Sequence, residues 1–275
     1  ESARDFAQNE IAPTAVERDI KAEFPTDIVK KMGELGFLGM MVSPDYGGAG
    51  MDTISYVLAM IEISKVDASV GVIMSVNNSL VCWGLEEYGS DFLKQKYLTP
   101  LAKGEKLGAF ALSEPEAGSD ATKQHTIADK DGDFYVLNGI KNWTTNGTSA
   151  DYHLVIATTD KTKGHHGISD FVVEKGTPGF SFGNNSDFMG LRGTSNGELN
   201  FQDCRVPRTN ILGTENGYMK ISPAYASQAM LGMSAISLGI AQAAVDVAIE
   251  HAKTRQIGEE HISGYQGVQF LIAEM

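Results

Sequence analysis

The sequence predicts a multi-domain α+β protein. An α-helical N-terminal domain (1–107) is followed by a middle antiparallel β domain (108–216) and by the first, incomplete part of a C-terminal helical bundle (217–275). Apolar residues recur at helical spacing in the first and last segments. Between them, short runs of β-branched and aromatic residues alternate with turn clusters. These runs are too close together for crossover helices, so the strands are expected to pair antiparallel, in a barrel-like or sandwich-like arrangement.

The first segment contains the predicted N-terminal helices. Asp27 is expected to cap a helix over residues 28–35, which Gly36 would end. Residues 54–63 are apolar nearly all round, which predicts a buried helix. Two more helices are predicted over residues 80–88 and 91–101.

The middle segment contains the predicted strands. Residues 134–143 hold two β-like runs around Asn138-Gly139, a dipeptide typical of a two-residue hairpin turn. Further strands are predicted over Tyr152–Thr158, Ile168–Glu174 and Glu198–Phe201.

The helical pattern returns near Gly217. Residues 229–251 are rich in Ala and Met, with small residues on several faces, which indicates close helix packing or a subunit interface. Residues 266–275 continue the helical pattern without a stop signal, and residues 1–5 read as the interior of a helix. The chain is therefore expected to be truncated at both ends.

Composition excludes several functions. With 22 Lys+Arg against 35 Asp+Glu, the net charge of −13 argues against a nucleic-acid partner. Two cysteines, Cys82 and Cys204, are too few for a disulfide framework and indicate a reducing compartment. The six histidines show no metal-ligand spacing, so no metal site is expected, and no apolar run of about 18 residues predicts a membrane span. Motifs of phosphate loops, dinucleotide folds, zinc proteases and serine hydrolases are absent, so an enzyme of this sequence is expected to take its reactivity from a bound group.

Two segments contain candidate binding residues. Residues 110–121 predict a strand that ends in the hydroxyl of Ser113, followed by a tight turn over 117–120 whose amides could hold a phosphate or a ring carbonyl. An ordinary side-chain-stabilised turn is the alternative. Trp143 alternates with Thr145, so the two are expected to share one face of a sheet and to suit a planar heteroaromatic cofactor. For Trp143 the alternative is a core residue.

The two segments Phe110–Asp120 and Trp143–Gly147 resemble the flavin-binding signatures of the acyl-CoA dehydrogenase family, and the butyryl-CoA-like, short-chain branch is the most similar. The resemblance covers essentially the whole chain, in family order and spacing. Its other motifs are Asp45–Gly50, Met189–Gly193, Val206-Pro207, Ile211–Gly213, Ser237–Gln242, and Gln266 with Ala273–Met275.

This resemblance implies FAD between the middle and C-terminal domains. The implied contacts are Ser113 at the pyrimidine edge of the flavin, Thr145 at N5 and Trp143 beside the isoalloxazine. Ser119 would also contact the substrate, because with Gly118 it matches the place where the cofactor and the CoA arm meet. The cofactor-binding residues that it implies are Phe110, Leu112, Ser113, Gly118, Ser119, Trp143, Thr144, Thr145, Arg255 and Gln266.

Arg255 and Gln266 match positions that hold the FAD of a neighbouring subunit. The resemblance therefore implies a homotetramer or homodimer. It also implies an acyl-CoA substrate in fatty acid metabolism and an electron-transferring flavoprotein as the electron acceptor. The implied location is the cytoplasm of a bacterium or the matrix of a mitochondrion.

The sequence departs from the family at the catalytic base. The usual Glu matches a position about a hundred residues beyond Met275, and the alternative position on the first helix of the C-terminal domain is Ala229. The usual Asp-x-x-Arg is replaced by residues 227–230 (Ser-Gln-Ala-Met). The catalytic residue is therefore unknown, and Glu114, Glu198 and Asp203 are interpreted as surface carboxylates.

Three functions follow in order of preference. The first is FAD-dependent α,β-dehydrogenation of a short acyl-CoA, or the reverse enoyl-CoA reduction. The second is non-redox elimination from an acyl-CoA, which the loss of the Asp-x-x-Arg pair suggests. The third is a non-catalytic scaffold that keeps the flavin fold.

Overall fold

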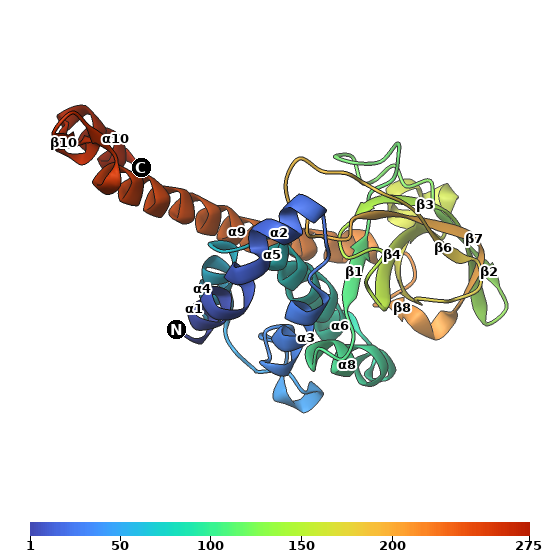
Figure 1. Ribbon diagram of the computed structural model, residues 1–275. Coiled ribbons are helices and arrows are strands. Elements are labelled where there is room, and N and C mark those ends of the chain that lie inside the picture. Colours follow the sequence, from blue (N-terminus) through green and yellow to red (C-terminus); the bar gives the residue numbers. More distant parts are fainter.

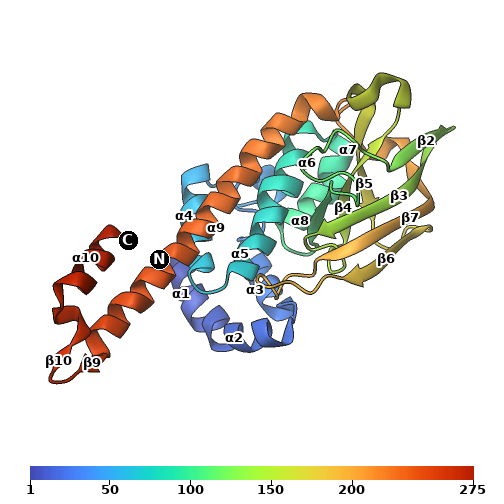
Figure 2. The same ribbon diagram turned by 90° about the horizontal axis from the view of Figure 1, so that it is seen from above.

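The computed structural model describes residues 1–275. Along the chain, a group of helices is followed by a β-sheet and then by one long helix (Figure 1). Figure 2 shows the long helix α9 (Tyr218–Thr254) passing along the helical part, with one end beside the sheet and the other beyond the body of the molecule. The N-terminal helical segments are α1 (Ser2–Phe6), η1 (Ala7–Ile11), α2 (Ala12–Lys21), α3 (Thr26–Glu34), η2 (Pro44–Tyr46), α4 (Thr53–Ser64), α5 (Ala68–Ser75), η3 (Val76–Cys82), α6 (Trp83–Tyr88), α7 (Asp91–Leu93), η4 (Lys94–Leu98) and α8 (Thr99–Ala102).

Two aspartates start the central helices. The Asp52 carboxylate accepts a hydrogen bond from the Ser55 backbone N–H at 2.7 Å at the start of α4, and Asp67 does the same for Ser69 at 2.8 Å at the start of α5. Each bond satisfies a backbone donor that the helix itself leaves unpaired. The segments α5, η3 and α6 then form one helix, so the helix predicted over 80–88 exists but begins much earlier, at Ala68.

Two details of the N-terminal prediction are wrong. Asp27 lies inside α3, which begins at Thr26 after Pro25 and has no side-chain cap. Helix α4 is buried on only one face: Tyr56, Met60 and Ile63 pack into the core, whereas Ile54 and Leu58 are 70% and 59% exposed. Because the sequence of α4 is apolar on all its faces, the sequence alone does not show which face packs against the rest of the chain.

The middle part forms one eight-stranded sheet in the order β6-β7-β3-β2-β4-β5-β8, with β1 also beside β4. Its two outer strands do not pair with each other, so it is not a closed barrel. The strands are β1 (Gly108–Ala111), β2 (Ile127–Asp131), β3 (Phe134–Thr144), β4 (Tyr152–Thr158), β5 (Ile168–Glu174), β6 (Phe180–Asn185), β7 (Gly197–Pro207) and β8 (Ile211–Leu212), with η5 (Lys161–Gly167) and η6 (Arg208–Asn210) between strands.

Most neighbouring strands are antiparallel, but the expectation that all would be is wrong. Strands β1 and β2 both lie parallel to β4. The chain that separates β1 from β4 includes the β2–β3 hairpin, and this hairpin with its loops serves as the crossover connection instead of a helix.

The predicted hairpin turn at Asn138-Gly139 is also wrong. Both residues lie inside the continuous strand β3, and the turn that joins β2 to β3 is Gly132-Asp133. The pairing of β3 with β7 shifts register between Leu137 and Gly139, as in a β-bulge. A Cβ at Gly139 would lie 2.6 Å from the Thr126 Cα, so this glycine serves close backbone approach and not a turn.

Small residues let α9 pack closely on the N-terminal helices, as predicted from its composition. A Cβ at Gly239 would lie 2.7 Å from the backbone oxygen of Ile61 in α4, and Gly232 is similarly tight against Ser75 of α5. The far end of α9 leads into β9 (Gln256–Ile257), β10 (Glu260–His261), η7 (Ile262–Gly264) and α10 (Gln266–Glu274), which lie away from the rest of the chain (Figure 1).

Two helical stretches are long and apolar enough to cross a membrane by length and composition alone, Ala68–Tyr88 and Tyr218–Thr254. The first is a core helix, since 78% of its apolar window is buried in the protein. In the second, 22% of the window is buried, and its inner face packs on α4 and α5.

Candidate functional site

An apolar cavity of about 500 Å³ lies between the sheet and α9. The first end of α9 forms one wall, and the loop after β1 together with the end of β3 forms the other. Nine of its 13 lining residues are hydrophobic. They are Leu80, Phe110, Leu112, Ser113, Ala121, Asn142, Trp143, Tyr218, Ser222, Pro223, Tyr225, Ala226 and Ala229.

The indole of Trp143 forms part of the rim of this cavity. Trp143 has a positive φ of 54°, which is rare for a side chain of this size, and the pairing of β3 with β7 shifts register between Lys141 and Thr144. The side chain is 54% exposed. The interpretation of Trp143 as a core residue is therefore wrong.

Thr145 does not share a face with Trp143 in the way that strand alternation predicted. Strand β3 ends at Thr144, and the Thr145 hydroxyl donates to Asn196 Oδ1 at 2.9 Å. The Thr144 side chain is buried with its hydroxyl unpaired. Neither threonine lines the cavity.

Two polar atoms of cavity-lining residues have no partner within the chain. The Ser113 hydroxyl makes no hydrogen bond, although the backbone oxygen of Ser113 accepts from the Asn142 N–H at 2.8 Å and so joins the loop to β3. The side-chain oxygen Oδ1 of Asn142 is buried and unpaired. An apolar cavity with an indole and unpaired polar groups suits a flat aromatic ligand that carries polar atoms on its edge.

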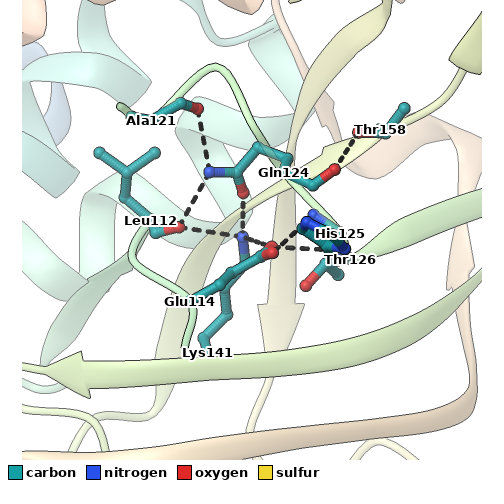
Figure 3. A network of polar contacts seen from close by, with 8 residues as sticks. All are labelled: Leu112, Glu114, Ala121, Gln124, His125, Thr126, Lys141 and Thr158. Atoms are coloured by element: carbon teal, nitrogen blue, oxygen red, sulfur yellow. Dashed lines mark hydrogen bonds and ion pairs between the residues drawn. The ribbon is translucent and has the colours of Figure 1, made fainter. Parts of the chain in front are cut away.

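A buried ion pair supports the loop that carries Ser113 (Figure 3). Lys141 Nζ lies 2.7 Å from Glu114 Oε1, and both side chains are at most 1% exposed. The same ammonium group donates to the Leu112 backbone oxygen at 3.1 Å and to Gln124 Oε1. The four groups fix the backbone on both sides of Ser113 relative to β3.

Glu114 is therefore not the surface carboxylate that the sequence suggested. Its two oxygens also accept from the backbone N–H groups of His125 and Thr126 at 2.6 and 3.0 Å. Burial alone would raise the pKa of Glu114, but the charge of Lys141 and these hydrogen bonds lower it. Burial lowers the pKa of Lys141, which Glu114 partly offsets. With its charge fully paired, Glu114 is unsuited to act as a base.

The remaining sequence-predicted residues lie outside the cavity lining. Gly118 and Ser119 are exposed in the turn after Glu114. Arg255 and Gln266 are exposed near the far end of α9, remote from the cavity in the same chain (Figures 1 and 2). Phe110, Leu112, Ser113 and Trp143 thus line one cavity, whereas Gly118, Ser119, Thr144, Thr145, Arg255 and Gln266 are not part of its lining.

Known proteins match along the whole chain. Family models of the acyl-CoA dehydrogenase N-terminal, middle and C-terminal domains match residues 1–105, 109–204 and 227–275. The short-chain specific acyl-CoA dehydrogenase of Rattus norvegicus mitochondria is 43% identical over 275 residues, which are all of this chain and 67% of the relative. The chain belongs to the acyl-CoA dehydrogenase family.

Solved structures agree with this membership. The butyryl-CoA dehydrogenase of Megasphaera elsdenii is 41% identical with a TM-score of 0.97, over 99% of this chain and 72% of that one. A chain from a structure described as "Electron transferring flavoprotein of Acidaminococcus fermentans: Towards a mechanism of flavin-based electron bifurcation" is 44% identical, also with a TM-score of 0.97 and the same coverage. The acyl-CoA dehydrogenase fold confirms the predicted sequence of helical, β and helical parts.

No carboxylate or imidazole lines the cavity of this family member. Ala229, where the sequence resemblance led us to expect the alternative position of the base, does line it. Its methyl group cannot accept a proton. The 275 residues therefore supply the cavity and its polar edge without a base inside it.

A second buried carboxylate, Asp170 on β5, lies behind the cavity wall. Its Oδ2 accepts a hydrogen bond from the Tyr225 hydroxyl at 3.1 Å, and its Oδ1 is unpaired. Burial raises the pKa of Asp170 to about 8, against a smaller opposing effect of the Tyr225 hydrogen bond and of Lys141. No sequence pattern predicts this contact, since the two residues are 55 positions apart.

Replacing Asp170 by asparagine is expected to change how stability depends on pH. In the unfolded chain an aspartate has a pKa of about 3.9, so the folded protein keeps a proton that the unfolded chain releases. Stability from this group is complete below about pH 4 and is lost as pH rises toward 8, by about 1.4 kcal/mol per pH unit. Asp170→Asn should therefore gain stability relative to the wild type as pH rises.

Urea unfolding of both proteins at several pH values between about 4 and 8 measures this difference. Asp129→Asn, at an exposed position of β2, is the control and should change the unfolding free energy by less than about 0.5 kcal/mol. A constant difference between Asp170→Asn and the wild type over this range would contradict the expectation.

Proposed function

We propose that this chain is an FAD-dependent acyl-CoA dehydrogenase. It removes two hydrogens from the α,β bond of a short acyl-CoA thioester, or catalyses the reverse reduction, and it exchanges electrons with an electron-transferring flavoprotein. The observation that carries the proposal is the cavity between the sheet and α9, where a half-exposed indole lies on the same wall as Ser113, whose hydroxyl makes no hydrogen bond in the chain. Membership in the acyl-CoA dehydrogenase family supplies the reaction class.

The residues around this cavity fit a flavin. In the proposal Trp143 packs beside the ring, Ser113 donates to its pyrimidine edge, and Phe110 and Leu112 exclude water from it. Bound FAD supplies the hydride acceptor. Thr144 and Thr145 directly follow Trp143 in the sequence. We propose that both contact the flavin, although neither lines the cavity. Gly118 and Ser119 contribute exposed amides and a hydroxyl to the phosphate-bearing parts of FAD and acyl-CoA.

A second copy of the chain completes the cofactor site in this proposal. Arg255 and Gln266 are exposed and lie far from the cavity of their own chain, so they can contact FAD only in a neighbouring subunit (Figure 1). We therefore propose a homotetramer or homodimer. We also propose three domains with bounds 1–107, 108–216 and 217–275, and a location in a bacterial cytoplasm or, in a eukaryote, in the mitochondrial matrix.

FAD binding tests the site. Trp143→Ala is expected to weaken FAD binding by about 10- to 100-fold, because burying an aromatic side chain against a ligand contributes about 1.5–3 kcal/mol. Phe134→Ala is the matched control, since Phe134 is an exposed aromatic at the other end of β3. Quenching of flavin fluorescence on titration measures both. Equal affinities in the two variants would contradict the proposed site.

Anaerobic mixing of the FAD-loaded protein with butyryl-CoA separates the three functions. Loss of the flavin absorption band supports dehydrogenation. Product without this loss supports elimination, the alternative that the replacement of Asp-x-x-Arg by residues 227–230 suggests. Binding with neither change supports a scaffold.

A further inference from the structure

The cavity has a closed end formed by two tyrosines of α9. Among its lining residues only Tyr218 and Tyr225 are buried, at 5% and 3% exposure. Trp143, Pro223 and Ala226 are exposed and form the open side. A ligand that enters past Trp143 therefore meets the tyrosine rings last.

The Tyr225 ring is held in place from behind. Its hydroxyl donates to Asp170 Oδ2 on β5 and packs against Gly84 of α6. A Cβ at Gly84 would overlap that hydroxyl and would lie 2.8 Å from the ring carbon Cζ. Trp83 and Phe110 flank the ring, with centroids 5.5 and 5.0 Å away. The ring has no room to move away from the cavity.

We propose that Tyr225, fixed by Asp170 and by the close approach of Gly84, sets the length of the acyl group that this protein accepts. This inference rests on the proposed function. The hydroxyl points away from the cavity toward Asp170, so Tyr225 acts through the bulk of its ring and is a specificity-determining residue without a part in the proton or hydride transfers. The tail that fits is short and uncharged, because no Lys, Arg or His lines the cavity to pair with a terminal carboxylate.

Two substitutions on opposite sides of the same contact should shift the preference in opposite directions. Tyr225→Leu opens the closed end, and the ratio of octanoyl-CoA to butyryl-CoA affinity should rise about tenfold or more, since each methylene placed in an apolar pocket is worth about 1–3 kcal/mol. Gly84→Ala pushes the ring into the cavity, so butyryl-CoA affinity should fall about tenfold and octanoyl-CoA affinity should fall further, which lowers the ratio.

Anaerobic calorimetric titration of the proteins loaded with already reduced FAD measures these affinities without turnover, because reduced flavin cannot accept a hydride from a saturated acyl-CoA. Tyr88→Leu is the control: Tyr88 packs on Trp83 at 5.6 Å but does not line the cavity, so its ratio should stay at the wild-type value. Tyr225→Phe keeps the ring and should also keep the ratio. If Tyr225→Leu fails to fold, the comparison of Gly84→Ala with Tyr88→Leu decides.

The outcomes separate this inference from the proposed function. If the wild type binds neither acyl-CoA, both are overturned. If it binds butyryl-CoA and the ratio is unchanged in folded Tyr225→Leu, or butyryl-CoA affinity is unchanged in Gly84→Ala, the proposed role of Tyr225 is overturned while the flavin site stands.

Discussion

Replacing Lys141 by methionine is expected to destabilise the fold by about 3–5 kcal/mol, because it leaves the Glu114 carboxylate buried without its counter-charge. The Leu112 backbone oxygen and Gln124 Oε1 lose the same donor (Figure 3). Since these contacts fix the loop on both sides of Ser113, FAD binding should weaken beyond what global stability explains. Urea unfolding measures the first effect, and flavin titration under native conditions measures the second.

Lys130→Met is the matched control, because Lys130 pairs with Glu215 at 3.7 Å in an exposed position and should cost at most about 1 kcal/mol. The double variant Lys141→Met with Glu114→Gln removes both charges and should recover part of the loss. If Lys141→Met is as stable as Lys130→Met, Glu114 takes up a proton or reaches water when Lys141 is removed. That result would contradict the structural role that we assign to the Lys141–Glu114 pair.

Local sequence patterns predicted the regular elements well where one physical cause dominates. The strands Tyr152–Thr158 and Ile168–Glu174 have the predicted bounds because both are β-branched, largely buried runs between clear turn segments. The Asn138-Gly139 turn failed because pairing of β3 with β7 outweighs a local turn preference. Gly139 is needed for the approach of Thr126, a contact that the sequence does not reveal.

The cavity could be predicted only in part. Ser113 and Trp143 were predicted because their motifs resemble those of a known family. The positive φ that directs the indole to the cavity could not be predicted, because tryptophan has no preference for that backbone conformation. Glu114 and Lys141 are 27 positions apart, and charged residues of this kind are ordinarily exposed, so their burial follows only from the fold. The pairing of Tyr225 with Asp170 is hidden for the same reason.

No carboxylate or imidazole lines the cavity, so a base introduced at Ala229 is expected to have a large effect on the reaction rate. Ala229→Glu should raise the initial rate of flavin reduction by butyryl-CoA about 10²- to 10⁴-fold in a chain of these 275 residues, because a positioned general base contributes about that factor. Ala229 lines the cavity from α9, one turn beyond Tyr225, so a longer side chain there enters the space beside the flavin-binding wall. Stopped-flow absorbance under anaerobic conditions measures the rate.

Ala229→Gln is the control, because glutamine has the size and hydrogen-bonding reach of glutamate but does not accept the proton. If the glutamate works as a base, its rate should fall at low pH with the protonation of one carboxyl group, and the glutamine variant should show no such dependence. Equal rates in the two variants that both bind butyryl-CoA would mean that position 229 does not face the reacting carbon. A faster glutamate variant would place the reacting carbon between α9 and the strand that carries Trp143.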